Sequence, residues 1–196
     1  MAGKKERELR SVGLGVEGRP YQRILGWFFA FPNIETSLTE LCVRTRTSKT
    51  AAKGIVVRLE KDGFLRKRVA GRAWLISAVK GHVFLSTKRV AANLALVYDS
   101  DILSVVRARV PNARAIVLFG SYRKGDDLPK SDMDIAVEIA GNKPLEIVEL
   151  GEFPRFGYRT NVKVNLHVFS RKNVDINVFA NIANGIILEG FLEVRP

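Results

Sequence analysis

The chain has 196 residues and a formal net charge of +12 at pH 7. Its apolar run at residues 24–31 is far shorter than the roughly 18 residues that a membrane-spanning helix needs, so we expect no membrane partner. The charged N-terminus is not followed by an apolar segment, which argues against a secretory signal and favours a cytoplasmic, nucleoid-associated protein. A single cysteine, Cys42, excludes an internal disulfide.

The charge is distributed unevenly along the chain. Residues 1–98 hold 19 Lys and Arg against 7 Asp and Glu, whereas residues 99–196 hold 13 of each. Clustered cations gain affinity for phosphates by releasing counterions. The asymmetry therefore predicts a nucleic-acid-binding half joined to a half with a different task, and the length is sufficient for two small domains.

The basic half begins with a glycine-containing segment, residues 1–19, for which we predict a flexible basic arm. Three signals of helices follow. Pro20 can occupy the first turn of a helix, apolar side chains recur twice at helical spacing, and Gly63 is placed to end the last helix. These signals predict helices over residues 20–31, 38–44 and 48–61. Residues 64–69 and 72–76 then flank Ala70-Gly71 and predict a basic hairpin.

Helices followed by a basic hairpin make residues 20–80 resemble the winged helix-turn-helix domains of bacterial and archaeal regulators. In that arrangement the N-terminal end of the longer helix reads bases, and the hairpin contacts backbone phosphate. A helical bundle with a solvated basic face is the alternative. The candidate DNA-binding residues are Arg46, Lys49, Thr50, Lys53, Arg66, Lys67, Arg68 and Arg72.

Residues 81–110 are predicted to form a helical linker. Apolar side chains recur at helical spacing on both sides of Asp99-Ser100-Asp101, which has the composition of a helix break and a new N-cap. The apolar stripes could pack within the chain or support a homodimer.

The second half contains the pattern with the most chemical content. An apolar run, residues 115–119, ends at Gly120-Ser121, and ten residues separate Ser121 from Asp132-Met133-Asp134. Backbone N–H groups at a Gly-Ser turn that opens a helix can bind phosphate oxygens. Strand alternation then places Asp132 and Asp134 on one face, where two carboxylates could hold a divalent metal against a triphosphate.

This pattern resembles the minimal nucleotidyltransferases of the DNA polymerase beta superfamily. The resemblance implies a mixed-sheet α/β domain over residues 111–196, so that the whole chain is α+β. It implies a nucleoside triphosphate and Mg²⁺ as ligands, with Gly120, Ser121 and Lys130 binding the nucleotide and Asp132 and Asp134 binding metal. Arg123 and Lys124 could also reach a triphosphate, although a solvated loop of both signs, with Asp126 and Asp127, explains these cations as well.

The resemblance also implies a third carboxylate on a later strand, for which residues 162–169 are the candidate. Asn165 occupies that position, completing a predicted catalytic set with Asp132 and Asp134. A neutral amide offers an oxygen to a metal but is not a base near neutral pH. His167, on the same face, could act as the base or be an ordinary strand residue.

Two functions follow from this departure. The first is a DNA-binding regulator or antitoxin-like factor whose transferase site has degenerated. The second is an active Mg-dependent enzyme that moves a nucleoside monophosphate from a triphosphate to a protein or nucleic-acid hydroxyl. The resembled family includes antitoxins that pair with HEPN-type toxins, so such a toxin is one implied acceptor.

The last third of the chain has only local patterns to indicate its elements. We predict a helix over residues 144–150, a loop over 153–158, a helix over 174–183 and a strand over 186–194.

Overall fold

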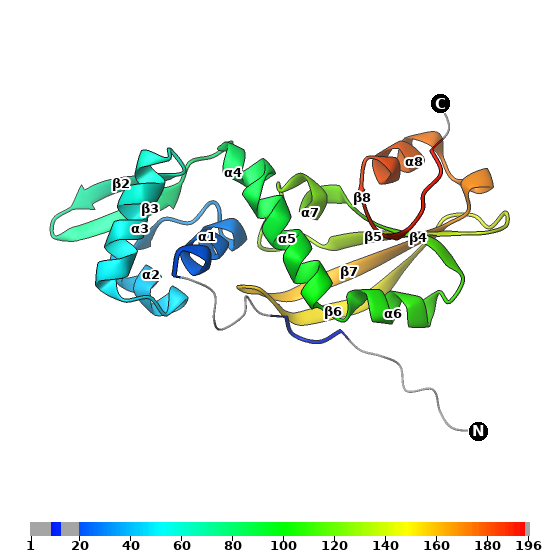
Figure 1. Ribbon diagram of the computed structural model, residues 1–196, viewed down its shortest axis with the longest axis horizontal. Coiled ribbons are helices and arrows are strands. Elements are labelled where there is room, and N and C mark those ends of the chain that lie inside the picture. Colours follow the sequence, from blue (N-terminus) through cyan, green and yellow to red (C-terminus); the bar gives the residue numbers. More distant parts are fainter. Residues whose placement is uncertain (1–8, 13–19, 195–196) are drawn as a thin grey trace, which may run out of the picture.

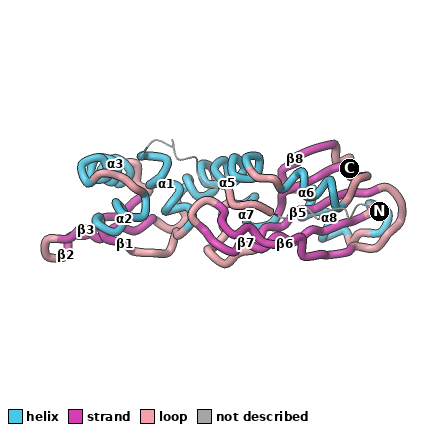
Figure 2. The backbone as a smooth tube through the Cα atoms, turned by 90° about the horizontal axis from the view of Figure 1, so that it is seen from below, coloured by secondary structure: helices cyan, strands magenta, loops and turns pink. Residues whose placement is uncertain are grey.

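A computed structural model describes residues 9–12 and 20–194 of the chain. The molecule is elongated, with the β2–β3 hairpin (residues 65–78) at one end and the strands β4 to β8 (residues 113–190) toward the other (Figures 1 and 2). Each part has its own large hydrophobic core. We call residues 20–78 the N-terminal domain. The other described residues, which include the five-stranded sheet, are the C-terminal domain.

The N-terminal domain contains three helices and a three-stranded antiparallel sheet. The helices are α1 (Pro20–Ala30), α2 (Leu38–Thr45) and α3 (Lys49–Lys61), in agreement with the predicted ones. Ser37 and Ser48 cap α2 and α3 by accepting hydrogen bonds from backbone N–H groups of the first turns. The sheet has the order β1 (Thr36–Ser37), β3 (Ala73–Ala78), β2 (Leu65–Ala70); the β2–β3 hairpin was predicted, whereas β1 was not.

The predicted linker is a packed part of the structure. It consists of α4 (Val83–Ser86), α5 (Lys88–Asp99) and α6 (Ile102–Arg109). In α5, Ala92 packs against the N-terminal core, while Leu96 and Val97 are buried in the C-terminal core. One helix therefore belongs to both domains, and it runs through the middle of the molecule in Figure 1.

The C-terminal domain is built on a five-stranded mixed sheet of order β6-β7-β5-β4-β8. The strands are β4 (Ala113–Phe119), β5 (Met133–Ile139), β6 (Glu146–Phe156), β7 (Arg159–Phe169) and β8 (Ile186–Gly190). Only the β5–β7 pair is parallel among the described strands. α7 (Gly120–Lys124) follows β4, while the 3₁₀ turn η1 (Arg171–Asn173) and α8 (Ile176–Ala183) follow β7.

The helices cover the two faces of this sheet unequally. α5 and α6 pack on one face and complete a core that includes Ile116, Ile135 and Leu166. On the other face α8 covers only the part around Val117, Ala136 and Phe169. The remainder of that second face carries the polar side chains of Asp134, Asn165 and His167, together with the exposed Ile147 on β6.

Three predictions in this domain differ from the structure. Residues 144–150 are not a helix and residues 153–158 are not a loop, because most of both segments forms β6, the edge strand. A bulge between Glu149 and Gly151 shifts the register by one residue. The shift breaks the alternation by which a strand is identified in a sequence, and pairing with β7 determines the structure instead. The final strand also ends at Gly190, before the predicted residue 194.

The predicted arm lies mostly outside the described residues, which begin at Leu9 and are interrupted at 13–19. Within the described part, Leu9 and Val12 are buried in the C-terminal core. Val12 also forms a parallel bridge with Phe156 at the edge strand. No helix of the described residues is long and apolar enough to cross a membrane.

Candidate functional site

The site begins at the turn between β4 and α7. Gly120 has a φ of 70°, a left-handed conformation that favours glycine. A Cβ atom on Gly120 would lie 2.6 Å from Oδ2 of Asp134. The absence of a side chain therefore allows the backbone of the turn to lie directly against a carboxylate on the next strand.

The two aspartates lie at the start of β5. Met133 and Ile135 point into the core, so Asp132 and Asp134 point to the opposite, open face. Asp132 is exposed and Asp134 is half-buried. Both carboxylates are therefore available to a ligand beside the Gly120 turn.

β7 places Asn165 and His167 beside these aspartates. Parallel pairing sets Asp134 opposite Asn165, and the side chain of His167 lies on the same face. The Asn165 amide donates to Oδ2 of Asp132 at 3.4 Å, and Nε2 of His167 lies 3.2 Å from Oδ1 of Asp134. The His167 ring also packs edge-on against Phe119, with centroids 4.9 Å apart. Each carboxylate thus has one side-chain partner from β7, an amide for Asp132 and an imidazole ring for Asp134.

The donor set meets the needs of a divalent metal only in part. On β6, Glu149 pairs with Asn165, so Asp134, Asn165 and Glu149 form a row across three adjacent strands. Among the described residues no group of three or more His, Cys, Asp or Glu side chains could hold a metal alone. Mg²⁺ commonly binds one or two carboxylates together with substrate phosphates and water. Two aspartates beside an open turn fit that mode of binding.

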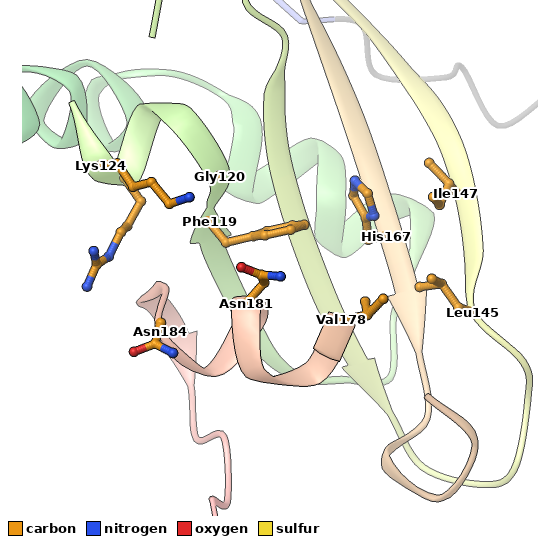
Figure 3. Close-up of a pocket in the computed structure, with 10 residues that line it drawn as sticks. Phe119, Gly120, Lys124, Leu145, Ile147, His167, Val178, Asn181 and Asn184 are labelled. Carbon is orange, nitrogen blue, oxygen red and sulfur yellow. The ribbon is translucent and has the colours of Figure 1, made fainter. Parts of the chain in front are cut away.

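A pocket of about 280 Å³ adjoins the carboxylates between the sheet and α8. Its walls include Phe119, Arg123, Lys124, His167, Asn181 and Asn184. In Figure 3 Lys124 and Gly120 lie on one side, His167 lies across the sheet face, and Asn181 and Asn184 project from the region of α8. We call this the α8 pocket. It combines cations, amides and aromatic surface next to two carboxylates, which suits a phosphorylated aromatic ligand.

Ser121 and Lys130, the other predicted nucleotide ligands, do not line the α8 pocket. Ser121 is half-buried in the first turn of α7. Lys130 is exposed in the loop before β5 and lines a second pocket of about 430 Å³, together with Phe31, Asp132, Tyr158, Arg159 and Lys163. We call this second cavity the junction pocket, because Phe31 belongs to the N-terminal domain.

A buried charge network lies behind the junction pocket. Asp127, which is fully buried, forms ion pairs with Arg89 and Arg159, which are also buried. Asn93 donates to Oδ1 of Asp127 at 2.9 Å and to the carbonyl of Tyr122 at 3.2 Å. The interpretation of this loop as wholly solvated is therefore wrong for Asp127. Its partners lie more than 30 residues away in sequence, and no local pattern indicated them.

Burial changes the acid–base properties of this network. Desolvation raises the pKa of the Tyr122 phenol, against the smaller opposing effect of Arg159. Desolvation also lowers the pKa of Arg89, and the attraction of Asp127 opposes that change. The network sets two arginines against the single carboxylate of Asp127.

The candidate DNA-binding residues fall on different surfaces. Lys49, Thr50 and Lys53 are exposed near the start of α3, and Arg46 is exposed in the turn before it. Nζ of Lys53 and Nζ of Lys67 lie 5.7 and 4.6 Å from the centre of the Trp74 ring, on the side of the hairpin turned toward α3.

The remaining hairpin cations have other surroundings. Lys67 also pairs with Glu60 of α3 at 2.8 Å. Arg68, on the opposite face of the hairpin, donates two hydrogen bonds to Glu35 and lowers the pKa of that carboxyl. Arg66 shares the face of Arg68, and Arg72 is exposed beside the tip at Gly71.

Comparison with known families supports the assignment of the second half. Residues 100–184 match the model of the nucleotidyltransferase domain family. The matched segment contains the Gly120 turn, both aspartates, Asn165 and His167. A nucleotidyltransferase-like domain is therefore present, as predicted, and the match begins before the predicted boundary at residue 111. A search of curated proteins found no match.

Proposed function

We propose that this protein binds DNA through its N-terminal domain and a nucleoside triphosphate with Mg²⁺ through its C-terminal domain. Such a protein would act as a regulator or antitoxin-like factor. The observation that carries the nucleotide part is the close approach of the Gly120 turn to Asp134, beside the cationic and aromatic α8 pocket.

The chemistry of the site suits a triphosphate. Arg123 and Lys124 offer charge to phosphate oxygens, and Phe119 and the amides of α8 offer apolar and hydrogen-bonding surface to a nucleoside. Asp132 and Asp134 would hold the metal, which neutralises phosphate charge when it is bound. Among the described ion-pair contacts, Asp132 has none, and Asp134 has only the contact with the His167 ring.

The DNA-binding part rests on the arrangement of α2, α3 and the β2–β3 hairpin. Two helices joined by a short turn, followed by a hairpin, are the elements of a winged helix-turn-helix. Lys49, Thr50 and Lys53 lie at the end of α3 that would enter a groove, and Lys67 lies on the hairpin face beside them. The surplus of cations in residues 1–98 supplies the attraction to phosphate.

A second candidate function is nucleotide transfer, and the contact between His167 and Asp134 favours it. The oxygen of an acceptor hydroxyl would bond to the α-phosphorus, and the bond from that phosphorus to the bridging oxygen would break. Pyrophosphate would leave with the electron pair, and the hydroxyl proton would pass to His167 in place of the carboxylate that position 165 lacks. The acceptor would be a hydroxyl of nucleic acid or of a protein such as a HEPN-type toxin.

Nucleotide binding is tested by thermal unfolding with each of the four nucleoside triphosphates and Mg²⁺. A ligand at 100 times its dissociation constant stabilises the folded state by about 2.7 kcal/mol, so at least one nucleotide should raise the Tm. Asp132→Asn should abolish the shift, whereas Asp126→Asn, an exposed neighbour, should retain it. If none of the four nucleotides raised the Tm, the proposed nucleotide binding would be refuted.

Transfer is tested with α-labelled nucleotides and candidate acceptors. The wild type should label an acceptor, His167→Ala should lose labelling while keeping the thermal shift, and Asn165→Asp should increase labelling. Nucleotide binding without labelling of any acceptor by the wild type or by Asn165→Asp would leave binding as the function of the site and refute transfer.

A further inference from the structure

We propose that the junction pocket binds the terminal nucleotide of a single nucleic-acid strand. The pocket lies beside Asp132 and is lined by residues of both domains. Its place, charge and aromatic surface each point to that ligand.

The position of the pocket follows from the face of β7. Lys163, Asn165 and His167 alternate along one face of this strand, with Lys163 in the junction pocket and His167 in the α8 pocket. Four residues of extended strand span about 13 Å. Asp132 therefore lies in the wall of the junction pocket, and Asn165 and Asp134 lie between the two pockets. Ligands in the two pockets would meet at the carboxylates.

The charge around the pocket is positive. Lys130 and Lys163 are exposed at its rim, and Arg159 forms part of its wall. Behind the wall, Arg89 and Arg159 share the single carboxylate of Asp127. One nitrogen of Arg159 has no hydrogen-bond partner among the described residues. A phosphate at the rim would offset this uncompensated positive charge.

The pocket also offers aromatic surface and an unusual backbone. Phe31 and Tyr158 are both partly exposed, and Phe31 is held by contact with the Trp27 ring. Nucleic-acid bases stack on such side chains whatever their sequence. Asn161, also in the pocket, has a φ of 54°, and left-handed residues other than glycine are concentrated at ligand sites.

Both domains are needed to form the pocket. Arg159 donates to the carbonyls of Phe29 and Ala30 at the end of α1, and Phe31 follows directly. A strand held by the basic N-terminal domain could therefore place its end in the pocket. Use of that terminal hydroxyl as an acceptor rests on the proposed nucleotide transfer, whereas binding of the strand end does not.

The test uses the full chain and a single-stranded trinucleotide that carries a 5′ fluorophore and a free 3′ hydroxyl. Fluorescence anisotropy at low salt would measure its affinity for the wild type and for Lys130→Gln/Lys163→Gln. Loss of two phosphate contacts should weaken binding about tenfold. The matched control Lys143→Gln/Lys172→Gln, which removes exposed lysines beyond the other end of β5 and β7, should bind as the wild type does. Equal affinity of the two double variants would overturn the proposal.

Two further probes test the nature of the ligand. A circular single strand has no end, so it should bind more weakly than the linear strand of the same sequence and length. Equal binding of the two would overturn end recognition. A hexaglutamate peptide that displaced the trinucleotide as well as unlabelled trinucleotide does would overturn the assignment to nucleic acid.

The nucleotide thermal shift, measured on the wild type and on a single variant, separates this inference from the proposed function. A shift retained by the single variant Lys163→Gln, which leaves Lys130 in place, shows that the fold and the α8 pocket are intact. A wild type without any shift, but with lysine-dependent trinucleotide binding, would refute only the proposed nucleotide site. A normal shift with lysine-independent trinucleotide binding would refute only the junction pocket.

Discussion

At the scale of single residues, Gly120 combines a left-handed backbone with a close approach to Asp134. An alanine at this position would destabilise the folded state by about 1–2 kcal/mol because of its positive φ, and its Cβ atom would displace the Asp134 carboxylate. We expect Gly120→Ala to lower the free energy of unfolding by that amount and to abolish the nucleotide thermal shift. Chemical denaturation and thermal scans measure both effects.

Gly81→Ala is the matched control for backbone strain. Gly81 has a φ of 74°, and a Cβ atom added to it would meet no atom within 4 Å among the described residues. This variant should lose a similar free energy of unfolding and keep the thermal shift. Loss of the shift in both variants would mean that strain alone, and not contact with Asp134, controls the site.

Tyr122 gives a prediction at alkaline pH. Burial raises its pKa above the ordinary value of 10.0, so the folded state binds the phenolic proton more tightly than the unfolded state. The resulting stabilisation is complete below pH 10 and is lost as the pH rises through the raised value. Tyr122→Phe should therefore flatten the fall of the unfolding free energy above pH 10, measured by denaturation at a series of pH values. An unchanged alkaline slope would contradict this account.

The alternation of side chains along a strand made several residues of the site predictable. Alternation along residues 132–139 and 162–169 was sufficient to place Asp132, Asp134, Asn165 and His167 on one face of the sheet. The partners of Asp127 were not predictable, because tertiary packing alone brings Arg89 and Arg159 to it. Periodicity thus reports the face of a side chain but not its distant neighbours.

At the scale of elements, α3 and the hairpin present two cationic surfaces that differ in orientation. Lys49→Gln/Lys53→Gln removes charge from the side with α3, where we propose that DNA binds. The slope of log affinity against log salt should fall by about 2, because each phosphate contact contributes about 0.9. Filter binding over a range of salt concentrations measures this slope.

Arg66→Gln/Arg68→Gln removes the same charge from the opposite face of the hairpin, where Arg68 is paired with Glu35. Its salt slope should stay close to that of the wild type. The reverse ranking of the two variants would place the DNA on the other side of the hairpin.

The same elements show where sequence prediction succeeds and where it fails. The three helices were predictable because Pro20 in the first turn of α1, Ser48 at the start of α3 and the apolar stripes are local signals. β1 is only two residues long, and β6 contains a bulge, so neither has a periodic pattern. β1 depends on pairing with β3, which is distant in the sequence, and β6 depends on pairing with β7, which continues on both sides of the bulge inside β6.

At the scale of the whole molecule, α5 and the Asp127 network join the two cores. Asp127→Asn would leave two buried arginines without a carboxylate, a change that costs about 3–5 kcal/mol. We expect this loss in the free energy of unfolding, together with the separation of one calorimetric transition into two. Asp126→Asn, on the exposed neighbour, should change the stability by less than about 0.5 kcal/mol. Two transitions in the wild type would show that the domains unfold independently.

The burial of Leu9 and Val12 makes the C-terminal domain discontinuous in the chain. Its core is completed by residues on both sides of the N-terminal domain, which is topologically an insertion. A fragment that began at residue 100 or 111 would lack Leu9, Val12, Leu96 and Val97 and would expose the sheet face that they cover. During synthesis the inserted domain can fold while the ribosome is still producing β4. Residues 9–12 can pack into the core only after β6 has been made, because Val12 pairs with Phe156.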